Sequence, residues 1–548
     1  MTVLTDSHLA TRTAPLRAVR PWTIAAAFGL IATVVCAAGS WIPSLWGDEA
    51  TSLLSAKRPI GTLLPMLTHV DAVHGLYYLL LHGWIRLAGE SPFALRFPSA
   101  VAIGLAVAAV TLIAGRRGGP QAAVVAGIVA TVLPRLTYAG EEARSYAGSA
   151  ALAAWLTLLI LWLIDGGGRN ADPRARRAAW ILYSIGTAVS AYLFLYSASL
   201  LLAHAALILA TRAPRRVWRA WAIASGSALI AAMPLIVLGF LERNQISYLQ
   251  NDGDDPTQYY YQLWFGIPLV AVVAWPLVAA ALAPAWAAWR RERGVRLGRD
   301  PRTIPRAELG EAPERPLSAT VVGAAWLFVP TAALLLVNAV FPMYTARYST
   351  FVAPAAALLV AEGVLVVGAW AGERLRRRGV AGDARWHGER ATVAATTVAA
   401  LLVIAACTPA YILQRGPFSK NDSDWAQVSA AVGEYAAPGD AVVFDESTRP
   451  SWRPRLAMRT YPAGFSGVRD VTLETPYYRN IGWADRAYSV EQAAERDRFD
   501  GVTRVWVLEY SFQGVEHTYG LSSLERLGFR QTGVRLQTHR TLILELRR

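Results

Sequence analysis

Two adjacent carboxylates, Asp48 and Glu49, follow the first long apolar run of the sequence, in the stretch SLWGDEATSLL. Carboxylates so near a membrane-length apolar run are costly unless they are solvated, paired or used in chemistry. One explanation is that they cap a helix predicted from about Ala50, since negative charge stabilises a helix N-terminus. The other is that they provide a general base at the membrane surface, because apolar surroundings raise a carboxyl pKa and help it accept a proton from a hydroxyl.

Two further stretches combine arginine with aromatic and acidic residues. EEARSY contains Glu142, Arg144 and Tyr146, and YTARYS contains Arg347 and Tyr348. A guanidinium group binds phosphate oxygens with a fixed fork of donors, so these stretches suit an anionic lipid headgroup. A salt bridge within a loop is the simpler explanation for the first stretch. We predict all five residues as substrate-binding.

A third stretch, HVDAVHGLYY, contains His69, Asp71, His74 and Tyr77. Two histidines and an aspartate could bind a metal ion, but the cluster has no further ligands. Hydrogen bonding to a sugar or packing near the base is the better interpretation, and Asp71, His74 and Tyr77 are predicted to contact substrate. No cofactor is required, and a divalent cation is compatible with this set but not indicated by it.

Long apolar runs must position these residues, since the 548-residue chain is 54% hydrophobic. Runs of roughly 20 residues cross a bilayer, so the sequence predicts an all-α polytopic membrane protein with about eleven transmembrane helices. The net charge of +14 does not indicate nucleic-acid binding, because arginine clusters between apolar runs set membrane orientation. The expected spans are Pro21–Ile42, Ala94–Gly115, Gln121–Tyr138, Ala143–Ile164, Ala179–Phe194, Ser197–Thr211, Trp218–Leu241, Leu263–Trp289, Leu317–Phe341, Ser349–Trp370 and Thr392–Leu413.

The arginine clusters also predict which side each loop faces. If the short apolar stretch His74–Gly89 crossed the membrane, the later basic loops would face outward. We therefore expect a helix lying at the membrane interface there. Residues 1–20 are then a cytoplasmic N-terminal tail, and residues 21–413 form a transmembrane domain with a large first outer loop, 43–93. The candidate residues gather on the outer face of the plasma membrane.

Residues 414–548 are predicted to form a separate extracytoplasmic soluble α/β domain. DWAQVSAAVGEY has a helical pattern and precedes the apolar strand DAVVFD. TRVWVLEYS and HRTLILELR have strand patterns, and LSSLERLGF has the pattern of a short helix. Alternating helices and strands favour an α/β arrangement.

The order and sidedness of these motifs resemble the GT-C glycosyltransferases, above all the protein-O-mannosyltransferase family and its bacterial relatives, which include aminoarabinose transferases. The motifs are the early Asp-Glu pair, DAVHGLYYLLLH, EARSYA and ARYS, within about Pro21 to Trp370. The resemblance implies a GT-C fold and a polyprenyl-monophosphate-linked sugar as donor. It also implies that Asp48 is catalytic with Glu49 beside it, and that Arg144 and Arg347 contact the donor phosphate.

The reaction implied is a single displacement that inverts the anomeric carbon, with Asp48 taking the proton of an acceptor hydroxyl. The resemblance favours mannose as the sugar, and a glycan, glycolipid or protein as the acceptor. An arabinosyltransferase of the same superfamily acting on cell-wall glycan is one alternative. A lipid or solute transporter is another, but few charges lie inside the predicted spans, Glu362 being the clearest.

Overall fold

The computed structural model describes residues 20–165, 168, 170–245, 257–298, 317–378 and 384–548, so the predicted N-terminal tail lies almost wholly outside the described residues. The apolar runs form helices because a helix satisfies its backbone polar groups within one segment, as a membrane requires. The helical elements before residue 415 are α1 (Pro21–Ala37), α2 (Gly47–Lys57), α3 (Ile60–Met66), η1 (Ala72–His74), α4 (Gly75–Ala88), α5 (Pro92–Val132), α6 (Pro134–Gly140), α7 (Tyr146–Ile164), α9 (Pro173–Leu193), η2 (Leu195–Ser199), α10 (Leu200–Ala210), α11 (Arg215–Leu241), η4 (Gln258–Gln262), α12 (Pro268–Gly298), α13 (Ala319–Asn338), η5 (Ala346–Val352), α14 (Ala353–Arg378) and α15 (Ala384–Gln414).

Membrane-length helices dominate this part of the chain. Within the described residues, each predicted span contains a helix. The predicted spans before and after Gly119 are joined in α5, which kinks where Gly119 has a φ of 81° and Pro120 follows. A multi-pass membrane protein is thus supported, while the count of about eleven spans stays a prediction. Six helices of the described residues are long and apolar enough to cross a bilayer: Pro92–Val132, Tyr146–Ile164, Arg215–Leu241, Ala319–Asn338, Ala346–Arg377 and Gly388–Gln414.

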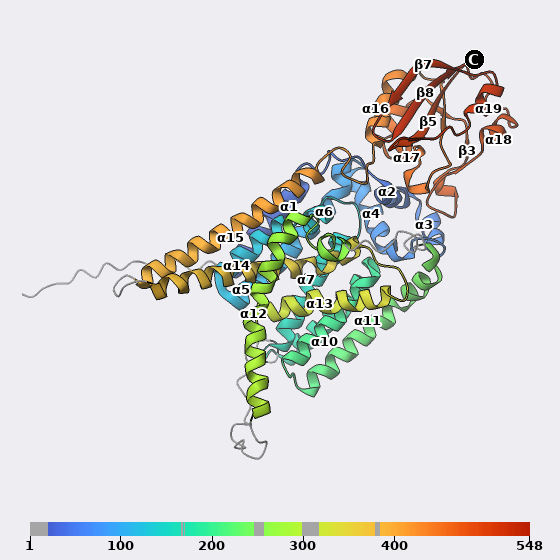
Figure 1. Ribbon diagram of the computed structural model, residues 1–548. Coiled ribbons are helices and arrows are strands. Elements are labelled where there is room, and N and C mark those ends of the chain that lie inside the picture. Colours follow the sequence, from blue (N-terminus) through green and yellow to red (C-terminus); the bar gives the residue numbers. More distant parts are fainter. Residues whose placement is uncertain (1–19, 166–167, 169, 246–256, 299–316, 379–383) are drawn as a thin grey trace, which may run out of the picture.

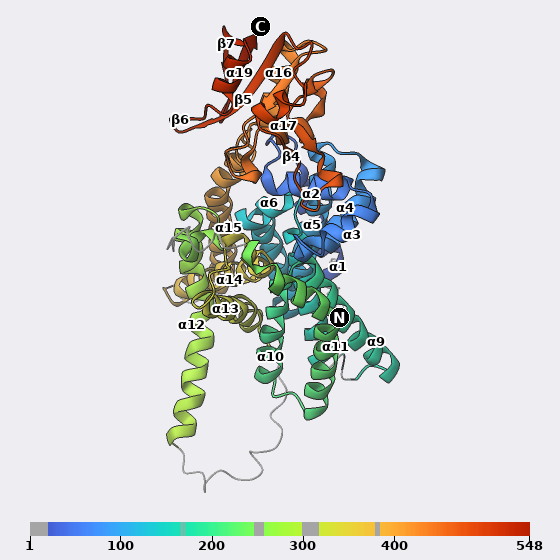
Figure 2. The ribbon, with the colours of Figure 1, turned by 90° about the vertical axis from the view of Figure 1, so that its right-hand side faces the viewer.

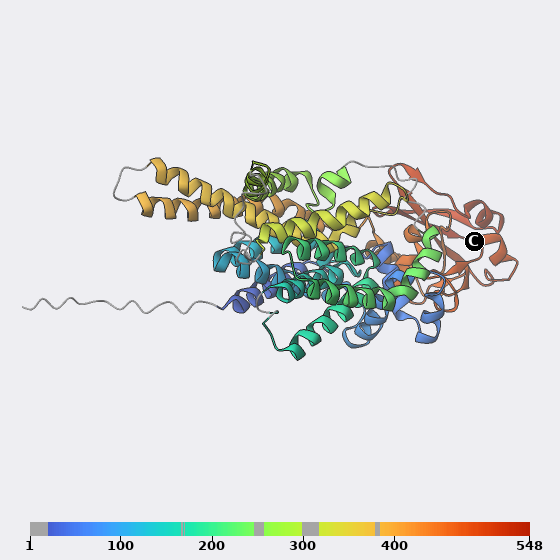
Figure 3. The ribbon, with the colours of Figure 1, turned by 90° about the horizontal axis from the view of Figure 1, so that it is seen from below.

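Small residues bring the helices into close contact. A Cβ atom on Gly104 of α5 would lie 2.0 Å from the Thr33 hydroxyl of α1, so only glycine fits there. A Cβ on Gly363 of α14 would lie 2.1 Å from the Leu277 carbonyl oxygen of α12. Such close backbone approach is typical of helices packed in membranes. Seen from below, α14 and α15 run together and extend away from the C-terminal domain (Figure 3).

Three short helices, α2, α3 and α4, lie at one end of the bundle, beside the C-terminal domain (Figures 1 and 2). α4 covers most of the predicted interfacial stretch. Its 14 residues span about 21 Å, less than the roughly 30 Å hydrocarbon core, which fits a helix that does not cross the membrane. Tyr78 and Leu81 of α4 pack into an apolar cluster with Leu53 of α2.

The C-terminal region is a strand-containing domain. Strands β1, β5, β8 and β7 adjoin in this order, with β2 beside β1 at one edge and β6 paired with β5. β1 is parallel to β2 and β5, and the β5–β8 and β7–β8 pairs are antiparallel. Its elements are α16 (Trp425–Tyr435), β1 (Ala441–Phe444), η6 (Pro450–Trp452), α17 (Arg455–Thr460), η7 (Pro462–Phe465), β2 (Arg469–Asp470), β3 (Leu473–Thr475), η8 (Tyr477–Arg479), β4 (Arg486–Ala487), α18 (Val490–Ala494), β5 (Arg504–Phe512), β6 (Val515–Glu516), α19 (Leu521–Arg526), β7 (Arg530–Gln537) and β8 (Thr541–Arg547).

Side chains alternate across this sheet and form two apolar layers. Trp506 and Leu508 of β5 enter one cluster, whereas Val505 and Val507 enter the other. This alternation follows from the two-residue repeat of a strand. The predicted helices in α16 and α19 and the predicted strands in β1, β5 and β8 are confirmed. β7, which was not predicted from the sequence, alternates exposed and partly buried positions at the sheet edge.

The core of the C-terminal domain also contains residues of α2. Ala50 and Leu54 are buried in one cluster with Trp425 and Phe444. Just before α2, the backbone N–H of Leu45 donates to the Tyr461 hydroxyl at 2.8 Å. The helix that carries the Asp-Glu pair is therefore held from both sides, by the bundle and by residues more than 370 positions later.

Candidate active site

Asp48 lies in the first turn of α2, with its side chain 22% exposed. Its carboxylate oxygen Oδ2 is 3.0 Å from Nη1 of Arg347 and 4.0 Å from Nε of Arg144. Nη1 of Arg144 also donates to the Asp48 carbonyl oxygen at 3.3 Å. The N-cap residue of α2 is Trp46, whose side chain makes no capping hydrogen bond. Three widely separated stretches thus meet at one partly exposed carboxylate.

Glu49 occupies a different environment from its neighbour. The side chain is fully buried, and Arg96 of α5 donates Nε to Oε1 at 2.7 Å and Nη2 to Oε2 at 2.5 Å. The backbone N–H of Ala143 donates to Oε1 at 2.8 Å. Arg96 also donates to the carbonyl oxygens of Ser40, Pro43 and Ser44. Glu49 therefore joins α2 to α5 and to the loop that carries Arg144.

Arg144 connects Asp48 to the HVDAVHGLYY stretch. Nη2 of Arg144 lies 2.8 Å from Nε2 of His74, and Nη1 donates to the Tyr78 hydroxyl at 3.3 Å. Tyr78 in turn donates to Oδ2 of Asp71 at 3.1 Å. Burial, together with the charge of Arg144, holds the pKa of His74 well below its usual range. His74 is therefore neutral, and its Nε2 accepts from the guanidinium group.

The remaining predicted residues of these stretches are less central. Tyr146 and Tyr348 are buried aromatic neighbours, with ring centroids 6.2 Å apart. Tyr77 is buried in the apolar cluster of α4 and packs edge-to-face on Tyr78. His69 is exposed; its ring contacts the Thr68 hydroxyl and the Pro65 carbonyl, and its own carbonyl accepts from the Gln245 amide at 3.2 Å. Within the described residues, no group of three or more His, Cys, Asp or Glu side chains is placed to bind a metal ion.

A cavity of about 520 Å³ opens beside Asp48. Arg347 lies on its wall and pairs with Asp48, so it links the cavity to the carboxylate. The Arg347 guanidinium also lies 5.5 Å from the centre of the Trp46 ring, within range of a cation–π interaction. The wall combines two guanidinium groups, one carboxyl group and apolar side chains; it includes Trp46, Arg135, Tyr138, Glu142, Gln262, Ile267, Arg347, Leu413 and Gln414.

Glu142 is the buried carboxyl group of this wall. Its Oε1 atom has no hydrogen-bond partner in the described part of the chain. Burial raises the pKa of Glu142 to about 7, although the charge of Lys420 opposes the shift. Near neutral pH this side chain is therefore protonated about half of the time, and the protonated form can donate a hydrogen bond to an anion.

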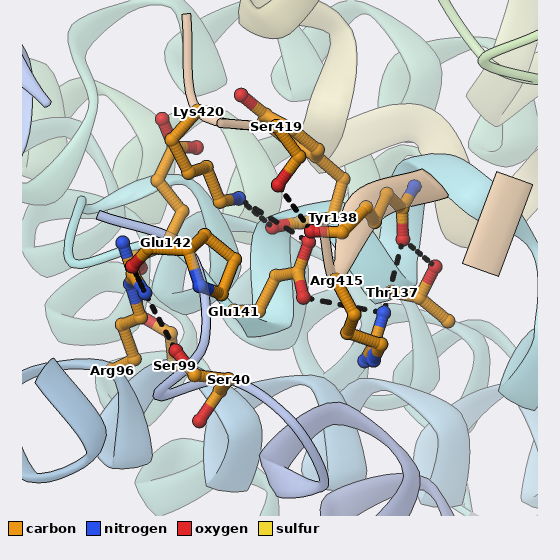
Figure 4. A network of polar contacts seen from close by, with 12 residues as sticks. Ser40, Arg96, Ser99, Thr137, Tyr138, Glu141, Glu142, Arg415, Ser419 and Lys420 are labelled. Carbon is orange, nitrogen blue, oxygen red and sulfur yellow. Dashed lines mark hydrogen bonds and ion pairs between the residues drawn. The ribbon is translucent and has the colours of Figure 1, made fainter. Parts of the chain in front are cut away.

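Glu141, the adjacent residue, fixes the segment after α15 against α6. Figure 4 shows it between Arg415 and Lys420, which lie 3.2 and 3.4 Å from its two carboxylate oxygens. The Lys420 ammonium also lies 3.5 Å from the centre of the Tyr138 ring. Burial lowers the pKa of Lys420 while the charge of Glu141 raises it, so the two charges depend on each other. This network supports the cavity wall from behind.

Several residues of this region were absent from the sequence prediction. Arg135, whose Nη2 donates to the Gln262 carbonyl oxygen, stands within an apolar run in TVLPRLTY. Charge at such a place is a signal that could have been used. Lys420, one of only two lysines in the chain, is fully buried. The pairing of Glu49 with Arg96 had no local signal, since the two residues are 47 positions apart.

The sequence matches no protein-family model and no curated protein. The structure is similar to that of ArnT from Cupriavidus metallidurans in the apo state, with a TM-score of 0.55 and 13% identity over 96% of this chain and 97% of that chain. The same protein bound to undecaprenyl phosphate gives a TM-score of 0.55 and 14% identity, over 96% of this chain and 98% of that chain. The apo oligosaccharyltransferase of Archaeoglobus fulgidus gives a TM-score of 0.50 and 12% identity, over 89% of this chain and 69% of that chain.

These solved structures are GT-C glycosyltransferases. The chain has their fold, so the GT-C architecture expected from the motifs is confirmed.

Proposed function

We propose that the protein is a membrane glycosyltransferase that moves a sugar from a polyprenyl-monophosphate donor to an acceptor hydroxyl. The observation that carries this proposal is the pairing of Asp48 with Arg347 at 3.0 Å, at the edge of a cavity whose wall contains a second guanidinium group, that of Arg135. A base and an anion site so close together match the two ends of a glycosyl transfer. The fold shared with ArnT, a protein that binds undecaprenyl phosphate, supports the same donor class.

In the proposed mechanism, Asp48 takes the proton of the acceptor hydroxyl as that oxygen attacks the anomeric carbon. The bond from this carbon to the phosphate oxygen breaks, and polyprenyl phosphate leaves. A single displacement inverts the anomeric centre. Arg144, held by the neutral His74, orients Asp48 through the backbone and the carboxylate. No metal ion is needed for this scheme.

The phosphate is proposed to lie between Arg347 and Arg135, with Glu142 as a further donor when it is protonated. Arginine binds phosphate oxygens with two parallel hydrogen bonds, and charge that develops on the leaving group is stabilised where it forms. Arg347 would exchange part of its contact with Asp48 for the phosphate. That exchange would release the carboxylate for its work as a base.

Glu49, expected with Asp48 in the catalytic pair, is proposed instead to be a positioning residue. Its burial and its two bonds from Arg96 leave no path to an acceptor oxygen. Tyr77 is likewise proposed to pack rather than to bind substrate. Asp71 and Tyr78 extend the hydrogen-bonded chain behind Arg144 and are proposed to orient it.

Mannose is the sugar that the motif resemblance favours, and arabinose is the alternative. The test is to incubate the purified protein in detergent with labelled polyprenyl-phosphate mannose or arabinose and an extract of cell-envelope glycan. Release of polyprenyl phosphate that depends on the extract, and that Asp48→Asn lacks, supports a transferase. A protein that binds the donor but never cleaves it would be a carrier, and the proposal would be wrong.

We also propose that the site faces the outside of the plasma membrane, with the N-terminus in the cytoplasm and the C-terminal domain outside. The two native cysteines, Cys36 and Cys407, are buried, so they do not interfere with labelling. Exposed Glu495, replaced by Cys, should react with an impermeant thiol reagent on intact spheroplasts. Arg174→Cys, at the far end of α9, should react only after lysis. The reverse pattern would invert the topology.

A further inference from the structure

A second cavity, of about 610 Å³, lies between α9 and α11, with Leu163 of α7 at its base. It shares no residue with the wall of the cavity beside Asp48. Three arginines, Arg176, Arg177 and Arg216, contribute to its lining at one end. Nothing in the proposed transfer reaction uses this site.

The cavity lies at the end of α11 opposite the active site. At the C-terminal end of α11, Oε2 of Glu242 accepts a hydrogen bond of 3.0 Å from the backbone N–H of Ala72, two residues before His74. Arg216 is 26 residues earlier, at the start of the helix. At about 1.5 Å per residue, these positions are about 39 Å apart along the helix, more than the roughly 30 Å of a hydrocarbon core. The arginines thus lie at the membrane interface opposite Asp48.

The rest of the lining is apolar and faces outward from the bundle. Ile181 and Ile185 of α9 are 54% and 56% exposed, and Ile223 of α11 is 70% exposed. In a membrane, these side chains meet acyl chains. Trp180 lies between the arginines and the isoleucines on α9, where an amphipathic ring suits the boundary between headgroups and hydrocarbon.

We infer that this groove binds an anionic glycerophospholipid from the leaflet opposite the active site. The arginines would hold the phosphate and any further negative charge of the headgroup, and the isoleucines would hold an acyl chain. Basic pockets between membrane helices bind lipids of this kind. A water-soluble anion would leave the apolar part of the groove uncovered, and a zwitterionic lipid would add no net negative charge beside the arginines.

The test compares lipids on purified, delipidated full-length protein. Phosphatidylglycerol and phosphatidylethanolamine with the same acyl chains are added in detergent, and bound lipid is counted by native mass spectrometry. Phosphatidylglycerol should be retained in preference. Arg177→Gln combined with Arg216→Gln should weaken its binding by about 30-fold, since each basic residue near a membrane surface is worth about 1 kcal/mol and tenfold in affinity corresponds to about 1.4 kcal/mol.

Matched variants separate this site from general surface charge. Arg174 and Arg219 are exposed on the same two helices but outside the groove, so their double substitution by Gln should leave binding unchanged. Ala220→Phe should displace the lipid by filling the groove while every arginine remains. Equal retention of the two lipids, or equal losses in both double variants, would overturn the inference. Binding of the phosphate headgroup that does not depend on the acyl chains would also overturn it.

Discussion

Replacing Glu49 by Gln tests whether the two adjacent carboxylates have separate tasks. The substitution keeps the shape of the side chain but removes the charge that two bonds from Arg96 and one from the Ala143 N–H now neutralise. Both partners of the ion pair are fully buried. Removing one partner of such a pair costs about 3–5 kcal/mol, because the other charge stays buried without compensation.

The expected loss can be converted into a change in melting temperature. At about 2.1 cal/mol/K per residue, 548 residues give an unfolding entropy of about 1.2 kcal/mol/K, so Tm falls by about 3–4 °C if the chain unfolds as one unit. Asp48→Asn is the matched partner. Because Asp48 and Arg347 are 22% and 25% exposed, their pair is worth less than about 1 kcal/mol and Tm should change by less than about 1 °C.

The assay measures thermal unfolding and sugar transfer on both variants in the same detergent. Asp48→Asn should keep its fold and lose about 10²–10⁴-fold in turnover, the usual worth of general base catalysis. Glu49→Gln should lose stability first, and its residual activity should return when the temperature is lowered. A Glu49→Gln protein as stable as the wild type would refute the structural assignment. Near-normal turnover of Asp48→Asn would refute the mechanism.

Three further predictions concern the cavity and α2. Arg347→Ala should weaken binding of polyprenyl phosphate by about 10–150-fold, as expected for one charge-assisted contact of about 1.5–3 kcal/mol; unchanged affinity in a titration would contradict the phosphate site. Glu142→Gln should stabilise the protein relative to wild type as pH rises. Below the unfolded pKa of 4.5, the wild-type carboxyl is protonated in both the folded and the unfolded protein. As pH rises past the folded pKa of about 7, the free-energy cost of burying its charge grows to about 3 kcal/mol. A Tm difference between variant and wild type that does not change between pH 5 and pH 8 would count against this. Gly47→Ala should lower both Tm and turnover, because its Cβ would lie 2.6 Å from the Ser451 backbone oxygen; Gly61→Ala, which meets nothing within 4 Å, is the control and should not.

Sequence patterns predicted much of this architecture because they report on burial and on the side of the membrane. Apolar length located the helices, and alternation located strands β1, β5 and β8. The arginine clusters predicted that Asp48, Arg144 and Arg347 share one face, and in the structure both arginines lie within 4.0 Å of the Asp48 carboxylate oxygen Oδ2.

The remaining features depend on contacts between distant segments. Adjacent residues on a helix point in different directions, so Asp48 pairs with Arg347 on the cavity wall while Glu49 turns into the bundle towards Arg96. The sequence contains no local signal for that difference. The pairing of Glu141 with Lys420, 279 positions away, is hidden for the same reason, since neither neighbourhood identifies its partner.

The shared core of α2 and the C-terminal domain limits how proteins of this fold can be recombined. A chimera that exchanged residues after 414 with those of another protein of this fold would cut through the packing of Ala50 and Leu54 against Trp425. It would also remove the Asn480 carbonyl that accepts from the buried Arg58 at 2.9 Å. Any crossover that keeps the fold intact must therefore carry α2 together with the C-terminal domain. The proposed base would then be inherited with the domain, and not with the helices proposed to hold the lipid.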